Sequence, residues 1–248
     1  MQQALEKRTL PAYADILPPA EQNWIIPFGP VIAKFTISEN VRDILWKNAL
    51  ETRNSDEQKQ KELNYANMLA GNIQHQYRYD LPDLEYTIVS KELETFAHKY
   101  AQILMHTGRW APENPEIEPS SEFDFSMGTL WHNWQQAAEW NPLHLHEGEF
   151  SMALFLKIPK EIEQERFQPH QQNNHPSAGK LAFLFGEPVP YCGIMQDVVP
   201  REGVAYFFPS KLRHLVYPFK SEVTRVSVST NFFFKENTPP EWESKIRV

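Results

Sequence analysis

With 248 residues, 41% of them hydrophobic, the chain is long enough for one well-filled core, and we expect residues 1–248 to form a single domain. Its formal net charge of −8 argues against a broad surface for DNA or RNA, and its single cysteine, Cys192, excludes an intramolecular disulfide framework. The start shows no secretion signal and no apolar run approaches the length that crosses a bilayer, so we expect a cytoplasmic protein without a membrane partner.

The first half of the chain is predicted to be mainly helical. We expect an extended N-terminal arm over residues 1–23 and helical support over 24–120, which opens with a strand or extended arm at WIIPFGPVIAKF. Serine caps and apolar faces predict two helices. Ser38 precedes a face of Val41, Ile44, Leu45 and Ala49, and Ser90 precedes a face of Leu93, Phe96, Tyr100 and Ile103.

Beyond residue 121 the spacing of apolar residues changes to alternation, which predicts a sheet core over 121–236 and a C-terminal tail over 237–248. Short strands separated by turns are typical of a sandwich or jelly roll, so the fold class is mainly β with flanking helices (α+β). Candidate strands are Phe123 to Trp134, Phe150 to Ile158, Lys180 to Phe185, Val204 to Phe208, His214 to Pro218 and Val223 to Phe234.

One polar segment, EIEQERFQPHQQNNHPSAG at 161–179, interrupts this pattern and is too long for a tight hairpin. We expect a surface loop there, with His170 and His175 in solvent. Its role stays open between a tolerated insertion and a lid over a site.

Three histidines are candidate metal ligands. His144 and His146 stand two residues apart in an extended segment, so their side chains point the same way. His214, at the end of a predicted hairpin, completes a facial set that leaves metal positions open for a co-substrate and oxygen. Glu149, beyond the turn at Gly148, is the alternative third ligand.

Alternation in the last strand places Arg225, Ser227, Ser229 and Asn231 on one face. This face either looks into solvent or lies inside a barrel, where an arginine needs a counter-ion. A dicarboxylate would supply it, because a guanidinium binds a carboxylate through two charge-assisted hydrogen bonds.

Taken together, His214 and Arg225-Val-Ser227 resemble the 2-oxoglutarate- and Fe(II)-dependent oxygenases, in which a distal histidine precedes Arg-x-Ser by about ten residues. The order and spacing of further motifs resemble the compact prolyl-hydroxylase-like oxygenases of tailed phages, over roughly residues 25 to 235. These motifs are Leu69-Ala-Gly-Asn-Ile73, Trp131-His-Asn133, Asn141-Pro-x-His-x-His-x-Gly148, Ser151, Phe208-Pro-Ser-x-Leu-x-His214, Pro218 and Arg225-x-Ser-x-Ser-x-Asn231.

The resemblance implies a double-stranded β-helix (jelly roll, cupin-like) core that uses Fe(II), 2-oxoglutarate as co-substrate and O2. It also implies that Arg225 grips the distal carboxylate of 2-oxoglutarate with help from Ser227, and that Asn133 contacts the co-substrate. The chain departs from the family where His146 replaces the expected Asp or Glu. We prefer His146 as the third ligand, with Glu149 as the alternative.

The function implied is an oxidoreductase, a dioxygenase that hydroxylates an unknown prime substrate, either a protein side chain or a metabolite, while 2-oxoglutarate becomes succinate. One alternative is a cupin-type metalloprotein, which does not require Arg225. The other is a non-enzymatic jelly-roll binding module, in which the histidines are incidental.

Overall fold

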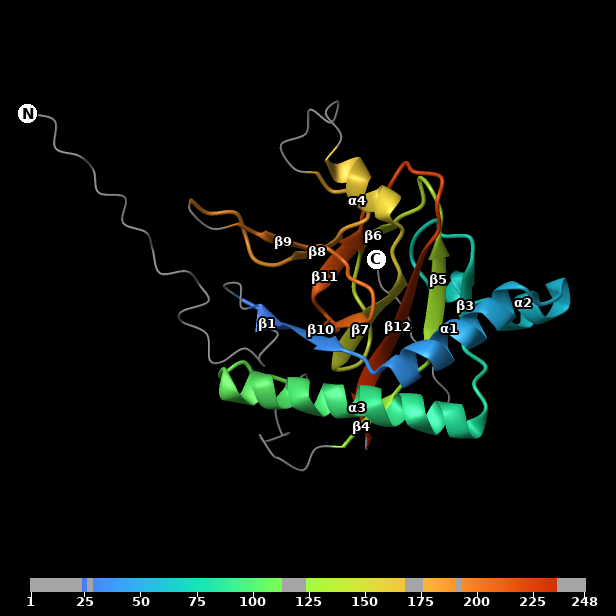
Figure 1. The fold of residues 1–248 in the computed structure, drawn as a ribbon. Coiled ribbons are helices and arrows are strands. Elements are labelled where there is room, and N and C mark those ends of the chain that lie inside the picture. Colours follow the sequence, from blue (N-terminus) through green and yellow to red (C-terminus); the bar gives the residue numbers. More distant parts are fainter. Residues whose placement is uncertain (1–23, 26–28, 113–123, 168–175, 191–192, 236–248) are drawn as a thin grey trace, which may run out of the picture.

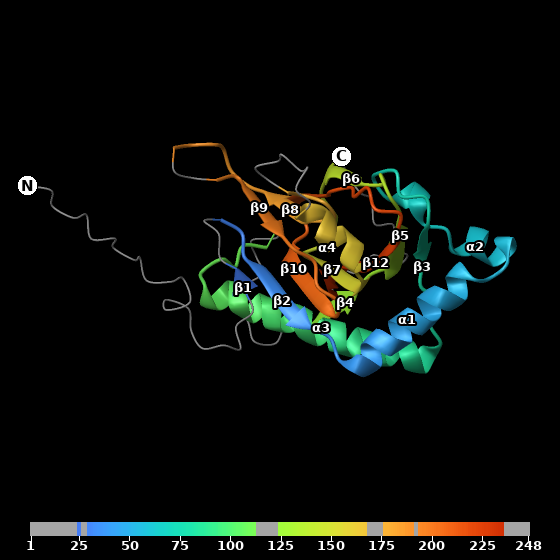
Figure 2. The same cartoon turned by 45° about the horizontal axis from the view of Figure 1, so that its top comes forward.

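Two antiparallel sheets form the body of the protein in the computed structural model, which describes residues 24–25, 29–112, 124–167, 176–190 and 193–235. The larger sheet has the strand order β1-β2-β10-β7-β12-β5-β3, with β4 paired to β12, and the smaller sheet has the order β6-β11-β8-β9. Figures 1 and 2 show the smaller sheet over one face of the larger one. The strands are β1 (Trp24–Ile25), β2 (Ile32–Thr36), β3 (Gln76–Arg78), β4 (Phe125–Met127), β5 (Trp131–Gln135), β6 (Asn141–His144), β7 (Phe150–Lys157), β8 (Leu181–Leu184), β9 (Met195–Val198), β10 (Val204–Pro209), β11 (Arg213–Val216) and β12 (Arg225–Phe234).

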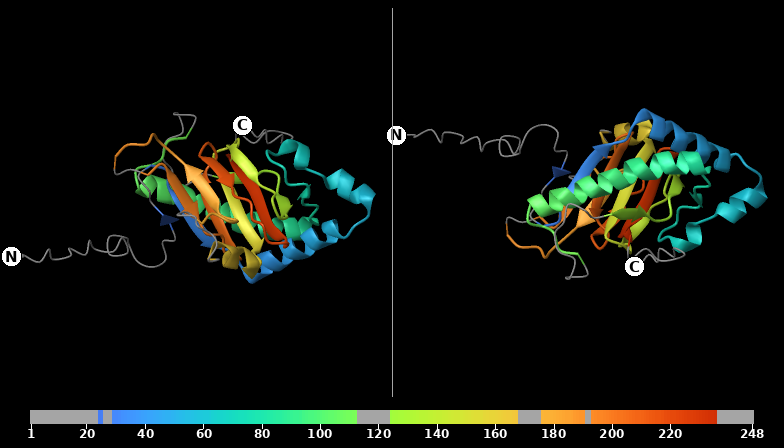
Figure 3. Two further views of the ribbon diagram at one scale, coloured as in Figure 1. Left: turned by 90° about the horizontal axis from the view of Figure 1, so that it is seen from above. Right: turned by 90° about the horizontal axis from the view of Figure 1, so that it is seen from below.

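Helices cover the opposite face of the larger sheet, where α1 (Glu39–Arg53) and α3 (Asp83–His106) run across the strands (Figure 3). One apolar core fills the space between these helices and the sheet, with Leu45, Leu93 and Val228 among its fully buried members. A second core lies on the other side of the sheet and joins Phe155 of β7 to the smaller sheet. The remaining helical segments are α2 (Glu57–Leu63), α4 (Lys160–Arg166) and the 3-10 turn η2 (Ala66–Met68).

The two predicted helix caps have different outcomes. Ser38 caps α1, because its Oγ accepts a hydrogen bond from the Val41 N–H at 3.2 Å. The prediction that Ser90 caps a second helix is wrong. Helix α3 already begins at Asp83, directly after Pro82, and Ser90 lies inside it with its hydroxyl donating to the Thr87 carbonyl. A serine within a helix can bond to the preceding turn in this way.

The strand predicted from Phe123 to Trp134 is two strands, β4 and β5, which pair with different parts of β12. Residues 128–130 leave the ladder between them. At this point the Gly128 N–H donates to the Asn231 carbonyl, and a Cβ on Gly128 would meet the Phe233 ring at 3.0 Å. The close approach of backbone and ring requires a bend that the alternation of the sequence does not reveal. The other predicted strands of the sheet core are confirmed, and their ends agree to within two residues.

Part of the polar segment 161–179 is helix rather than surface loop, so that prediction is wrong for α4. Ile162 is buried against Ala178 and Phe219, which gives the helix an apolar anchor. Two polar residues at its end are also buried because tertiary partners satisfy them. The Glu165 carboxylate accepts hydrogen bonds from the N–H groups of Lys220 and Ser221, and Arg166 Nη1 donates to the Ala178 carbonyl.

Several predictions fall outside the described residues. These concern the arm at 1–23, the tail at 237–248, Cys192 and the histidines His170 and His175. The choice between an insertion and a lid for the rest of 161–179 therefore stays a prediction. Among the described residues, no helix is both long and apolar enough to cross a membrane. The predicted fold class, mainly β with flanking helices, is confirmed.

Candidate active site

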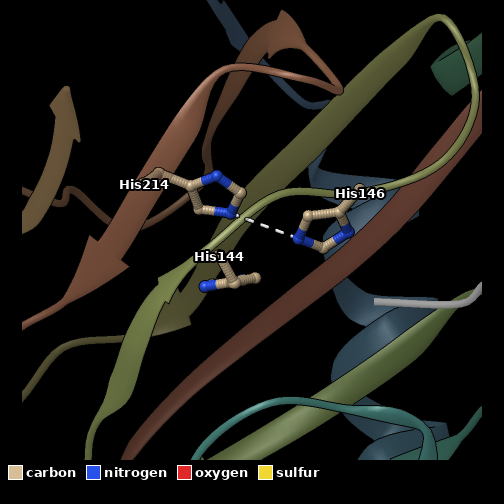
Figure 4. A group of neighbouring side chains, drawn as sticks. All are labelled: His144, His146 and His214. Atoms are coloured by element: carbon tan, nitrogen blue, oxygen red, sulfur yellow. Dashed lines mark hydrogen bonds between the residues drawn. The ribbon is translucent and has the colours of Figure 1, made fainter. Parts of the chain in front are cut away.

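Two strands of the smaller sheet bring the three histidines together. β6 and β11 are antiparallel, and their register places His214 directly opposite His144. His146 follows β6 by two residues, and its backbone N–H donates to the Ser210 carbonyl at 2.8 Å, which fixes the chain at the turn before β11. The side chains of His144 and His146 therefore point the same way, toward His214 (Figure 4).

The three imidazoles form a compact group that could hold a metal ion, with one ligand atom from each lying within 4.8 Å of the others. All three side chains are buried, and Nε2 of His146 lies 3.2 Å from Nε2 of His214. This group has no Asp, Glu or Cys member within the described part of the chain. Glu149, the alternative ligand, is therefore not placed with the histidines.

Burial keeps these histidines neutral. It lowers the pKa of His144, lowers that of His146 to about 3, where the nearness of His144 further disfavours protonation, and lowers that of His214 well below its usual value. A neutral imidazole offers a lone pair, which a metal ion needs. Three neutral nitrogen donors with open positions suit iron, although the more common non-haem iron set has two histidines and one carboxylate.

Arg225 lies in the same pocket and is almost completely buried. Its Nη1 donates to the Gly179 carbonyl at 2.7 Å, and its guanidinium lies 5.2 Å from the centre of the Phe155 ring. Among the described residues its Nε has no hydrogen-bond partner, and desolvation lowers its pKa to about 9 with no described acidic neighbour opposing this shift. The charge persists at neutral pH without a carboxylate to compensate it, which marks a site for an anion.

Ser227 and Asn133 line the pocket beside Arg225, on the neighbouring strands β12 and β5, where they are register partners. The Asn133 amide is held from both sides: Gln76 Nε2 donates to its Oδ1 at 2.8 Å, and its own Nδ2 donates to Ser227 Oγ at 3.4 Å. Sequence reasoning missed Gln76. Its strand, β3, is three residues long and carries no motif, so no sequence signal pointed to it.

One wall of the pocket comes from the helical half of the chain. Leu69, Ala70 and Ile73 line the pocket from the loop after η2. This loop is fastened by Asn72, which donates its N–H to the Trp140 carbonyl and accepts the Trp140 N–H at its Oδ1. The wall is apolar and presents no charge, so the guanidinium and the imidazoles provide the polar ends of the pocket.

The donors present fit iron and a dicarboxylate together, because neutral imidazoles and an uncompensated guanidinium face one pocket. A comparison with models of known protein families supports the same pair of ligands. Residues 129–231 match the family model described as "Putative 2OG-Fe(II) oxygenase". The matched segment is the part of the chain that carries the three histidines and Arg225, so the family model and the site geometry agree on a 2-oxoglutarate- and Fe(II)-dependent oxygenase centre. No curated protein sequence matches it.

Solved structures resemble the oxygenase along most of its length. AviO1 from Streptomyces viridochromogenes Tue57 has 13% identity and a TM-score of 0.51, over 85% of this chain and 92% of its own. SnoK, a non-heme alpha ketoglutarate dependent carbocyclase from nogalamycin biosynthesis, has 11% identity and a TM-score of 0.50, over 92% and 93%. A Pseudomonas putida prolyl-4-hydroxylase has 15% identity and a TM-score of 0.48, over 87% and 94%. At these identities the first two support the fold alone.

Three predictions are thereby confirmed: the oxygenase family, its enzymatic nature, and the use of Fe(II), 2-oxoglutarate and O2. The cupin-type metalloprotein and the non-enzymatic binding module are set aside. Arg225, which a cupin-type site does not require, lies in the pocket and not on the solvent face that the alternation of β12 also allowed. The resemblance to phage enzymes in particular stays a prediction.

Proposed function

We propose that the oxygenase is a hydroxylase whose Fe(II) is held by His144, His146 and His214. The observation that carries the assignment is the convergence of three buried, neutral imidazoles in a pocket that also contains a buried arginine, which has no acidic partner in the described part of the chain. No described carboxylate belongs to the group, which favours His146 over Glu149 as the third ligand. Three neutral imidazoles would hold Fe(II) without adding a negative charge from the protein.

Arg225 is the proposed partner of the distal carboxylate of 2-oxoglutarate. Its guanidinium already rests on Phe155 and on the Gly179 carbonyl, so little side-chain freedom is lost when the anion binds. Ser227 adds a hydroxyl donor from the same strand. Asn133, held by Gln76, presents an amide to the co-substrate beside them.

When bound, iron and 2-oxoglutarate supply the oxidising chemistry: O2, 2-oxoglutarate and a substrate C–H group give succinate, CO2 and a C–OH group. The chain contributes position and environment. Its histidines fix the metal, Arg225 fixes the co-substrate, and the apolar wall of Leu69, Ala70 and Ile73 limits the access of water to the reacting groups. No side chain of the pocket needs to act as a nucleophile.

The prime substrate, a protein side chain or a metabolite, stays a prediction from the family resemblance, as does the cytoplasmic location. We expect the reacting group of the prime substrate to be uncharged, because one part of the pocket lining carries no ionised side chain. This part consists of Leu69, Ala70, Ile73 and Trp131.

Succinate formation tests the residue assignments. Protein prepared without oxygen is loaded with Fe(II), and succinate made from 2-oxoglutarate under air is measured for the wild type, His214→Ala and Arg225→Ala. Arg109→Ala is the matched control, since Arg109 also donates to a glycine carbonyl, that of Gly29, but on the exposed surface. We expect turnover in the wild type and the control and its loss in the two site variants. Retained turnover in either site variant would overturn the role given to that residue.

A further inference from the structure

Two arginines, Arg166 of α4 and Arg225 of β12, hold neighbouring carbonyl groups of the same turn. Arg166 Nη1 donates to the Ala178 carbonyl at 2.9 Å, and Arg225 Nη1 donates to the Gly179 carbonyl at 2.7 Å. Both side chains are buried, so neither carbonyl is held by a surface contact. The arginine that faces the pocket is therefore linked to α4 through the backbone of two adjacent residues.

The turn between the arginines spans residues 177–180 and is closed by a hydrogen bond of 2.9 Å between the N–H of its last residue and the carbonyl of its first. Gly179 is the third residue, with a φ of +65°, which glycine adopts without strain. A Cβ on Gly179 would meet Ile162 Cγ2 at 2.5 Å, so the Ile162 side chain packs directly on this backbone. Helix α4 therefore fixes the turn in two ways, by an apolar contact from Ile162 and by a hydrogen bond from Arg166.

Helix α4 is itself fastened to the chain just before β12. The Glu165 carboxylate accepts the Lys220 N–H at 2.9 Å and the Ser221 N–H at 3.0 Å. Ser221 Oγ donates to the same carboxylate at 2.9 Å. Because Arg225 follows Ser221 closely in the sequence, α4 holds both the chain that leads to Arg225 and the turn that the guanidinium contacts.

The contact with Gly179 decides which edge of the Arg225 guanidinium can bind a carboxylate. A guanidinium binds a carboxylate best through two neighbouring nitrogen atoms. Nη1 of Arg225 is held by the Gly179 carbonyl, and its buried Nε has no hydrogen-bond partner among the described residues. The edge formed by Nε and Nη2 therefore remains for the anion. A shift of the Gly179 carbonyl would turn this edge and spoil its alignment with a bound carboxylate.

We propose that Arg166 is a positioning residue for 2-oxoglutarate, because it holds the turn whose Gly179 carbonyl orients Arg225. The inference rests on the proposed role of Arg225 in binding the distal carboxylate. Arg166 lies outside the pocket lining formed by the described residues, so it acts through Arg225 and not by touching the co-substrate. Without its donor the Ala178 carbonyl loses a buried hydrogen bond and the turn loosens. Arg225 must then be ordered when the anion binds, which weakens binding.

Affinity for 2-oxoglutarate, measured separately from affinity for the metal, tests the proposal. Anaerobic calorimetry on the full-length protein gives the Kd for Co(II) and, after Co(II) loading, the Kd for 2-oxoglutarate. In Arg166→Met we expect the Kd for 2-oxoglutarate to rise about 3- to 100-fold, the usual coupling within one hydrogen-bond network, with Co(II) affinity unchanged. Arg166→Lys keeps a cationic N–H donor and should recover much of the lost affinity. Ile162→Ala loosens the same turn without removing a charge, so it should also weaken 2-oxoglutarate binding, and it decides the question if Arg166→Met does not fold.

Asn48→Leu is the matched control. Asn48 is 7% exposed, like Arg166, and it also donates to a backbone carbonyl at 2.9 Å, that of Asp80, but from α1. We expect this variant to bind Co(II) and 2-oxoglutarate as the wild type does.

Two outcomes would overturn the positioning role. In the first, Arg166→Met binds 2-oxoglutarate as tightly as the wild type. In the second, it loses Co(II) affinity in the same proportion as 2-oxoglutarate affinity, which would make Arg166 a general structural residue. Arg225→Met separates this failure from that of the proposed function. If Arg225→Met binds 2-oxoglutarate weakly and Arg166→Met binds it normally, only the inference fails; if Arg225→Met itself binds normally, the proposed role of Arg225 is wrong and the inference falls with it.

Discussion

Replacing Arg225 with methionine changes stability and co-substrate binding in opposite directions. The guanidinium is buried, donates one backbone hydrogen bond to Gly179, and has no acidic partner among the residues that the structure describes. Its pKa of about 9 keeps it charged at neutral pH, so folding carries the cost of desolvating this charge. Methionine has a similar length, no charge and a surface that packs well against Phe155.

The expected magnitudes follow from the burial of this side chain. Replacing buried charged groups with well-packed apolar residues is often neutral or stabilising by about 1 to 4 kcal/mol, so we expect Arg225→Met to unfold at higher denaturant concentration than the wild type. Removing one member of a buried charge pair costs about 2 to 5 kcal/mol in binding. At about 1.4 kcal/mol per factor of ten, the Kd for 2-oxoglutarate rises by about 30- to 4,000-fold.

Two measurements check this prediction. Urea unfolding of the metal-free protein gives the stability, and anaerobic calorimetry of the Co(II)-loaded protein gives the Kd for 2-oxoglutarate. Arg109→Met, which loses an exposed arginine, should change neither by more than a few tenths of a kcal/mol. A variant that is less stable than the wild type and still binds 2-oxoglutarate normally would refute the reasoning, because Arg225 would then be a structural residue.

Three further predictions concern acid stability, the pocket wall and the third ligand. Burial lowers the pKa of His132 to about 3 from the usual 6.5, so the unfolded state binds more protons between these values and stability falls as the pH drops through this window, by up to about 1.4 kcal/mol per pH unit. His132→Gln should reduce that slope in urea unfolding of the metal-free protein between pH 6.5 and 5, and an unchanged slope contradicts the assignment. Gly71→Ala should lower the unfolding free energy by about 1 to 3 kcal/mol more than Gly186→Ala. Both glycines have positive φ, but a Cβ on Gly71 would meet Asn141 Oδ1 at 2.5 Å, whereas one on Gly186 meets nothing within 4 Å; equal losses would show that the wall is not tightly packed. Finally, His146→Ala should weaken Co(II) binding and Glu149→Ala should not, and the reverse result would restore Glu149 as the ligand.

The sequence by itself determined the features that depend on neighbouring residues. Two histidines at i and i+2 share one side of an extended chain wherever that chain lies, so His144 and His146 had to point together. The alternation of β12 likewise required Arg225 and Ser227 to share a face. The cap at Ser38 is equally local, since its bond reaches three residues along the chain.

Only the tertiary structure decided which distant residues contact these local features. It turned the polar face of β12 into a pocket, placed His214 beside a histidine 68 residues earlier, and brought Gln76 to Asn133 across 57 residues. It also made α4 stable, because Glu165 and Arg166 find buried hydrogen-bond partners in distant loops. Periodicity records which residues share a side, whereas the partner across a sheet depends on strand order and register, which are set by the packing of the whole chain.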